Sequence, residues 1–176
     1  SQARAAKAVN QEQLALYYGV GRFLSLNTRK KGWGSGMIKS ISKRLRSEMP
    51  GIRGFGETNL RNMRMFYEAW STIESNSSVV TDELKETSSG LAGYMTQVGD
   101  TDIDTIHQLR LMNLDNFPAV SFLSISFTHH MVIITHAKEW DERLFYIQYA
   151  FDRKLSIEEL EKVLKKDLYQ DRKSVV

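Results

Sequence analysis

The stretch that decides the fold is residues 30–70, KKGWGSGMIKSISKRLRSEMPGIRGFGETNLRNMRMFYEAW. In its first part, Ile38, Ile41 and Leu45 recur at the three- and four-residue steps of a helix, which a Met-Pro-Gly sequence closes. Its second part has apolar residues at the same steps: Leu60, Met63, Phe66, Tyr67 and Trp70. We therefore predict a helix-turn-helix-like unit over residues 36–70, two short helices joined by a glycine-punctuated turn.

Cationic side chains occupy both predicted helices and the turn between them. Two helices with outward cations can lie against a polyphosphate and place one helix in a groove. Arg61 and Arg64 lie one turn apart, where a recognition helix presents side chains to bases, and Asn59 could read an adenine edge or cap the helix. The predicted DNA-binding residues are Lys39, Lys43, Arg44, Arg46, Arg53, Asn59, Arg61 and Arg64.

The charge is divided unevenly along the 176 residues. Residues 1–70 hold 13 Lys and Arg against 4 Asp and Glu, whereas residues 71–176 hold 11 against 17. This asymmetry indicates that one end faces an anion such as nucleic acid, or that copies associate head to tail. We expect the chain to bind DNA and to form a homo-oligomer. The alternative is a protein-interaction or dimerisation domain whose basic face binds acidic protein.

The composition excludes several classes of protein. With 41% hydrophobic residues the chain is not a disordered one, and no run approaches the roughly 20 apolar residues of a membrane span, so we expect no membrane partner. The absence of cysteine excludes disulfides, thiolate zinc sites and cysteine nucleophiles, and agrees with a cytoplasmic protein. The chain begins SQARAAKAVN without methionine, so we expect a piece of a longer protein.

The rest of the sequence predicts a mostly α, multi-helix domain with at most a small β element. Residues 3–26 have the pattern of one long helix, with Ala5 and Val9 on its apolar stripe and Asn27 at its end. Residues 71–100 are rich in Ser and Thr without a sustained period, which predicts a loop or mobile insertion.

Residues 101–170 are predicted to form the C-terminal helices. We expect helices over residues 102–114 and 138–152, and a last one that begins at Ser156, where Glu159 can complete a capping box. Residues 120–127 alternate with a period of two and could form a short strand. Residues 127–140 have the length of a helix, although their β-branched residues favour a strand.

Two motifs, in the right order, resemble the YhcG-like family, whose members are predicted PD-(D/E)XK nucleases. The family's N-terminal domain has a Gly-Trp-Gly, a basic helix, a Pro-Gly-x-x-Gly-Phe turn, an Asn-Leu-x-x-Met-Arg-x-Phe segment and a closing Trp. Here these positions are Gly32-Trp33-Gly34, Pro50-Gly51, Gly54-Phe55, Asn59-Leu60, Met63-Arg64, Phe66 and Trp70. The family's His-bearing segment and Glu-Arg-x-Phe-Tyr-Ile helix match His129-His130 and Glu142-Arg143-Phe145-Tyr146-Ile147.

The resemblance implies that residues 1–176 are a single N-terminal, DNA-binding domain of helix-turn-helix-like type. It also implies a nuclease active site in a separate C-terminal domain of the full-length protein, so we expect no enzyme activity in this chain and Mg²⁺ only in the missing domain. A nuclease of that class places an Asp on one strand and an (Asp/Glu)-x-Lys on the next. No predicted strand flanks the triplets present here, Glu83-Leu84-Lys85, Asp152-Arg153-Lys154 and Asp171-Arg172-Lys173.

Histidines and aromatic residues suggest further ligands, but plainer roles are favoured. His129 and His136 share a helical face and have His130 beside them, yet no acidic residue at ligand spacing precedes Glu139. Packing and hydrogen bonding therefore explain them better than a metal, and we expect no cofactor. Several aromatic rings could stack on bases, but their helical spacing is more typical of a core facing Tyr17, Val20 and Leu24. They are Trp33, Phe55, Phe66, Tyr67 and Trp70.

Overall fold

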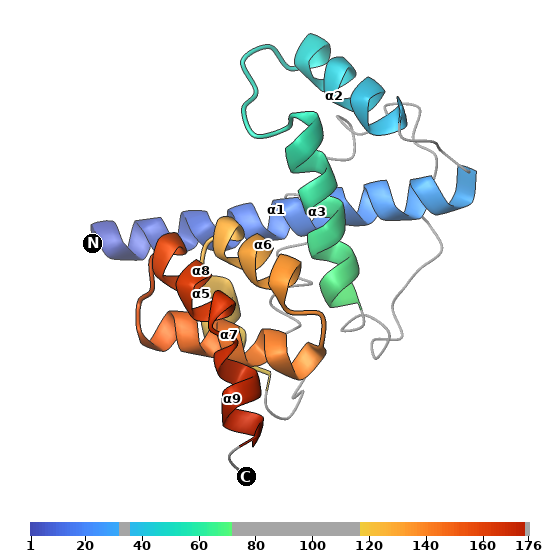
Figure 1. Cartoon of the computed structure of the whole chain (residues 1–176). Coiled ribbons are helices and arrows are strands. Elements are labelled where there is room, and N and C mark those ends of the chain that lie inside the picture. Colours follow the sequence, from blue (N-terminus) through green and yellow to red (C-terminus); the bar gives the residue numbers. More distant parts are fainter. Residues whose placement is uncertain (32–35, 72–116, 175–176) are drawn as a thin grey trace. The chain divides into compact units, whose positions relative to one another are not determined.

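A computed structural model describes residues 1–31, 36–71 and 117–174 (Figure 1). Within these ranges the chain forms eight helices and no strand, so the predicted mostly α fold is confirmed. The chain divides into two compact units. We call Ala15–Gln108 the basic unit, after the cations of residues 36–70 that it contains, and Ser1–Leu14 together with Leu109–Val176 the C-terminal unit. The predictions made for Trp33, for residues 72–100 and for residues 102–114 lie outside the described residues.

Helix α1 (Gln2–Lys31) is longer than predicted. It does not end at Asn27, because the Asn27 side chain donates a hydrogen bond from Nδ2 to the Phe23 carbonyl, 2.8 Å away and one helical turn earlier. The apolar stripe also begins later than expected, since Val9 is 65% exposed and Leu14 is the first buried residue of the helix. In the C-terminal unit, Asn10 on α1 donates to the carbonyl of Leu123 at 3.0 Å.

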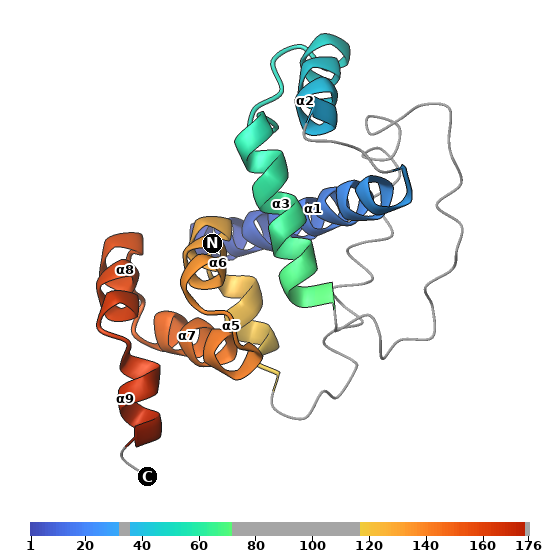
Figure 2. The ribbon, with the colours of Figure 1, turned by 45° about the vertical axis from the view of Figure 1, so that its right-hand side comes forward.

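The basic unit places α2 (Gly36–Glu48) and α3 (Glu57–Trp70) with the second half of α1. Figures 1 and 2 both show α3 crossing α1. At the crossing a Cβ on Gly21 would lie 2.0 Å from the Met63 carbonyl oxygen, so only glycine lets the two backbones approach this closely.

The aromatic residues of α3 form the core of the basic unit. Phe66 and Trp70 are fully buried, and the Tyr18 ring meets the Phe66 ring edge to face with 6.1 Å between centroids. Tyr18 also contacts Tyr67, at 5.1 Å. The prediction that this stripe is core is confirmed. The α1 residues expected to face it are buried as well: Tyr17, Val20 and Leu24.

In the C-terminal unit, α5 (Ala119–Ser124) and α6 (Phe127–His136) replace the strand that the alternating residues 120–127 suggested. The alternating pattern does not produce a strand, since the chain is helical to Ser124 and then extended for only two residues, Ile125 and Ser126. Ser126 caps α6, since its Oγ accepts from the His129 N–H at 3.2 Å. Burial of Ile133 and Ile134 outweighs their strand preference in α6.

The remaining helices are α7 (Trp140–Asp152), α8 (Ile157–Lys165) and α9 (Leu168–Ser174). Helix α6 packs on α8 and α5 on α7. The predicted capping box of Ser156 and Glu159 is present. Helix α9 was not predicted, and its Tyr169 N–H donates to the Tyr146 hydroxyl oxygen at 3.2 Å, which ties it to α7. Among the described helices, none combines the length and the apolar character of a membrane span.

Candidate nucleic-acid interface

The link between α2 and α3 is an eight-residue segment, 49–56, longer than the three- or four-residue turn of a helix-turn-helix unit. Two side chains hold it. The buried Ser42 hydroxyl of α2 donates to the Phe55 carbonyl at 3.0 Å, and Asn59 Nδ2 of α3 donates to the Gly54 carbonyl at 3.1 Å. Gly51 and Gly54 adopt φ values of 85° and 84°, which L side chains rarely reach. The link is therefore a defined turn attached to both helices.

The ring of Phe55 anchors this turn to α1. It meets the Tyr17 ring edge to face at 6.1 Å and is itself buried. The Tyr17 hydroxyl leaves no room beside Gly54, where a Cβ would lie 2.9 Å from its oxygen. With Phe55 pointing inward, Arg53 two residues earlier is exposed to solvent.

Helix α2 carries an acid-free row of cations, which we call the basic stripe: Lys39, Lys43 and Arg46. These positions follow the i, i+4, i+7 spacing of one helical face, and all three side chains are exposed. The buried residues Ile38 and Leu45 each precede a stripe residue, so the core holds the helix while the stripe faces solvent. Within the described residues no stripe side chain forms an ion pair.

The other cations on the two helices have an acid one turn away. Arg44 Nε lies 2.8 Å from Glu48 Oε1 on α2. On α3, Arg61 pairs with Glu57, and Arg64 Nε lies 3.0 Å from Glu68 Oε1. The Arg44 and Arg61 pairs are more exposed than the partly buried Arg64 pair, and exposed i,i+4 pairs contribute only a few tenths of a kcal/mol. Glu68 also accepts the Ser25 hydroxyl at 2.9 Å, which links the Arg64 pair to α1.

Asn59 does not cap α3, because Gly56 occupies the N-cap position. Its side chain is half-buried and its Nδ2 is bonded to the turn. Beside Arg61, the solvent-facing side of α3 carries an uncharged row that the sequence analysis did not single out: Thr58, the half-exposed Asn62, and Met65. Met65 is 39% exposed, whereas the next residue, Phe66, is fully buried. The i, i+4, i+7 spacing opposite the apolar stripe is the signal that identifies this row.

The three histidines of the described residues form hydrogen bonds within the C-terminal unit. The His129 ring bonds to the Ser126 hydroxyl through Nδ1 and to the Leu155 carbonyl through Nε2, at 2.6 and 2.8 Å. His130 is fully buried, its Nε2 lies 2.7 Å from the Phe122 carbonyl, and burial lowers its pKa to about 4. His136 bonds to the Val132 carbonyl at 3.0 Å. In the described ranges no group of three or more His, Asp or Glu side chains is arranged to hold a metal ion.

Two of the three acid-x-Lys triplets lie in the described residues, one at the end of α7 and one in α9, and neither is on a strand. Asp152 is the last residue of α7 and accepts a hydrogen bond from Gln148 Nε2 at 2.8 Å. Asp171 lies in α9, where the next residue, Arg172, covers the Phe145 ring with 5.3 Å to its centroid. The triplet that starts at Glu83 lies outside the described residues.

Comparison with known proteins gives one match. A search of curated proteins and a search of solved structures found no match for the chain. A family model, the DUF1016 N-terminal domain, matches residues 1–171. The match includes both motifs through which the sequence resembles YhcG-like proteins, and it spans the helices of both compact units. The chain therefore belongs to the DUF1016 N-terminal domain family, the N-terminal domain of YhcG-like proteins.

Proposed function

We propose that the chain is a DNA-binding and assembly module, which contacts duplex DNA through α2, the turn at 49–56 and α3. The observation that carries this proposal is the basic stripe on α2. Three exposed cations at helical spacing, with no acid among them, form a row that can meet successive phosphates. Because Ile38, Ser42 and Leu45 are buried beneath it, the row is presented by a supported helix rather than by a mobile tail.

The assembly role follows from the family resemblance. We propose that this domain works beside the C-terminal nuclease domain of the same full-length protein, and that it delivers that domain to DNA. Mg²⁺ would then be needed in the C-terminal nuclease domain. Neither acid-x-Lys triplet in the described residues lies on a strand, and Asp152 is already bonded to Gln148. We therefore expect the purified chain not to cut DNA in the presence of Mg²⁺ or Mn²⁺, as measured with supercoiled plasmid.

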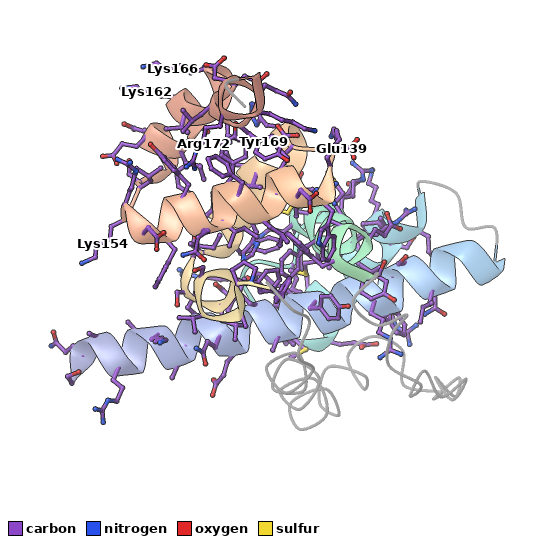
Figure 3. The ribbon with its side chains drawn as sticks, turned by 90° about the horizontal axis from the view of Figure 1, so that it is seen from below. Glu139, Lys154, Lys162, Lys166, Tyr169 and Arg172 are labelled. Carbon is purple, nitrogen blue, oxygen red and sulfur yellow. The ribbon has the colours of Figure 1, made fainter. Side chains whose placement is uncertain are left out.

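A matched pair of triple variants tests the proposal. One variant replaces the stripe: Lys39→Gln, Lys43→Gln and Arg46→Gln. The control removes three exposed cations from the C-terminal unit, Lys154→Gln, Lys162→Gln and Lys166→Gln, whose side chains extend outward from the ribbon in Figure 3. Both variants change the net charge equally, so only the location of the charge differs.

Duplex affinity is measured by fluorescence anisotropy between 50 and 200 mM salt. Each phosphate contact contributes about 0.9 to the slope of log K against log salt, so the stripe variant should lose about 2.7 from that slope. The C-terminal variant should keep the wild-type slope. Equal slopes in both variants, or a wild-type chain that binds polyglutamate and not duplex, would instead favour an acidic protein as the partner.

A further inference from the structure

We infer that α2 and the turn make the phosphate contacts, that α3 adds no net attraction, and that the surface therefore holds duplex DNA without preference for base sequence. This inference rests on the proposed function and specifies its ligand. It departs from the usual helix-turn-helix arrangement, in which the second helix enters the major groove and reads base edges.

The first argument is the charge of the two parts. Residues 36–53 hold five Lys and Arg and one Asp or Glu, whereas residues 57–70 hold two of each. The positive charge of the helix pair thus lies entirely on α2 and the turn. Nonspecific affinity for DNA depends on the phosphates that cations neutralise, so α2 and Arg53 supply this term.

The second argument is how the charges are ordered on α3. Glu57, Arg61, Arg64 and Glu68 follow one another at four-, three- and four-residue steps, which places them on one face of the helix. A carboxylate therefore stands at each end of the arginine pair, in contact with its neighbouring guanidinium. A phosphate that approached Arg61 would also meet the charge of Glu57. The two positive and two negative charges of this face cancel, and its net electrostatic attraction for a polyanion is close to zero.

The third argument concerns the groups that could read bases. Bidentate reading of guanine needs a free arginine fork, and reading of adenine needs a free amide. The Arg61 pair with Glu57 is weak, but it keeps a carboxylate beside the guanidinium at any base edge that Arg61 approaches, and Asn59 donates to the Gly54 carbonyl and helps to hold the turn. Reading a base with Asn59 would break the bond that positions Arg53 and Phe55. The outward row that remains, Thr58, Asn62 and Met65, has no charge with which to draw the helix into a groove.

The experiment compares two variants that leave the core untouched. The first is the stripe variant described above, with Gln at positions 39, 43 and 46. The second, Glu57→Gln with Arg61→Gln, removes a complete ion pair from α3 and leaves the net charge unchanged. Salt-dependent anisotropy is measured on AT-rich, GC-rich and mixed duplexes of equal length, and thermal melts check that each variant is folded.

We expect the slope of log K against log salt to be smaller by about 2.7 in the stripe variant. When the salt concentration rises from 50 to 200 mM, the wild-type affinity should therefore fall about 40-fold more than the affinity of the stripe variant. The α3 variant should keep both the slope and the affinity. The three duplexes should bind alike within about twofold, because a surface that contacts only phosphates distinguishes no base.

Two results would overturn the inference while leaving the proposed function in place. One is a loss of about 0.9 or more in the slope of the α3 variant, which would place Arg61 on a phosphate. The other is a preference of tenfold or more for one duplex that Asn62→Ala or Met65→Ala abolishes, since a base contact is worth about 1–3 kcal/mol. A wild-type chain that binds none of the duplexes would instead reject the proposed function itself.

Discussion

The basic unit and the C-terminal unit differ in how their cations are balanced by acids. Residues 117–174 hold nine Lys and Arg against nine Asp and Glu, and several of these cations have internal partners. The Arg153 guanidinium lies 4.6 Å from the centroid of the Tyr149 ring, and Arg143 Nε donates to the Ala137 carbonyl at 2.8 Å. Residues 36–70 hold seven against three, and the basic stripe has no ion-pair partner within the described residues.

The difference shows that a count of cations does not identify an anion-binding surface. What distinguishes the basic stripe is that three exposed cations share one helical face with no acid among them, in a segment that holds seven Lys and Arg against three Asp and Glu. The same distinction applies to the acidic residues, because the negative charge of residues 71–176 comes from residues 71–116, which hold 2 Lys and Arg against 8 Asp and Glu. The described C-terminal helices are therefore electrically neutral, and they offer no acidic face as a whole.

The largest expected effect tests whether the aromatic residues of the basic unit are core. Trp70→Ala removes a fully buried ring, which typically costs about 3–5 kcal/mol of the roughly 5–15 kcal/mol that stabilise a domain. We expect a sharply lower melting temperature or no soluble protein. Met65→Ala, on the exposed side of the same helix, is the control and should melt close to the wild type. A Trp70→Ala chain that melts normally but no longer binds DNA would move this ring to the interface.

The second largest effect concerns the pH dependence of stability, which we expect to come from His130 in the C-terminal unit. The pKa of His130 is lowered to about 4 by burial, below the usual value of 6.5, so the folded state resists protonation more than the unfolded state does. Stability should therefore be complete above pH 6.5 and fall as the pH drops toward 4, by about 2–3 kcal/mol at pH 4.5.

Urea unfolding at pH 7 and pH 4.5 measures this loss. His130→Gln should reduce the difference in stability between the two pH values, because Gln does not titrate. His136→Gln, at an exposed position, should leave the difference as it is in the wild type. An equal loss in the wild type and in His130→Gln would show that other groups cause the pH dependence.

A third change tests the close packing that supports the basic unit. Gly21→Ala places a methyl group 2.0 Å from the Met63 carbonyl oxygen, a backbone atom that cannot rotate away. Helices α1 and α3 must move apart, and we expect the free energy of unfolding to fall by about 1–3 kcal/mol. Gly36→Ala is the matched control, because a Cβ there meets no atom within 4 Å. Denaturation midpoints that coincide for the two variants would mean that α1 and α3 are not locked at this crossing.

The smallest expected effect concerns the end of α7. Lys154 has φ +49°, in the left-handed region that costs a residue with a Cβ about 1–2 kcal/mol and that glycine reaches freely. Lys154→Gly should therefore raise stability by up to about 1 kcal/mol, since the greater freedom of glycine in the unfolded chain offsets part of the gain. Lys154→Ala keeps the strain and should not be stabilised. Calorimetry that finds the same gain in both variants would attribute it to the lost charge.

Much of the fold follows from local patterns in the sequence. The apolar steps in residues 36–70 predicted α2 and α3, and the Ser156 and Glu159 pair marked the start of α8, because helical periodicity and capping involve residues within one or two turns. The i,i+4 pairs of Arg44, Arg61 and Arg64 could have been found in the same way, since the spacing of opposite charges on a helix is visible in the sequence.

Tertiary structure alone decided which of these residues remain available. The sequence itself determined a mostly α chain with a basic helix pair, but it left open that Val9 is exposed, that residues 119–124 are helical and that Asn59 is bonded to the turn. These outcomes go with contacts between segments far apart in the sequence, such as Asn10 with Leu123 in the C-terminal unit and Tyr17 with Phe55 at the turn, which no local spacing encodes. A polar side chain can meet a ligand only where the fold has not already given it a partner, because the existing bond must first be broken.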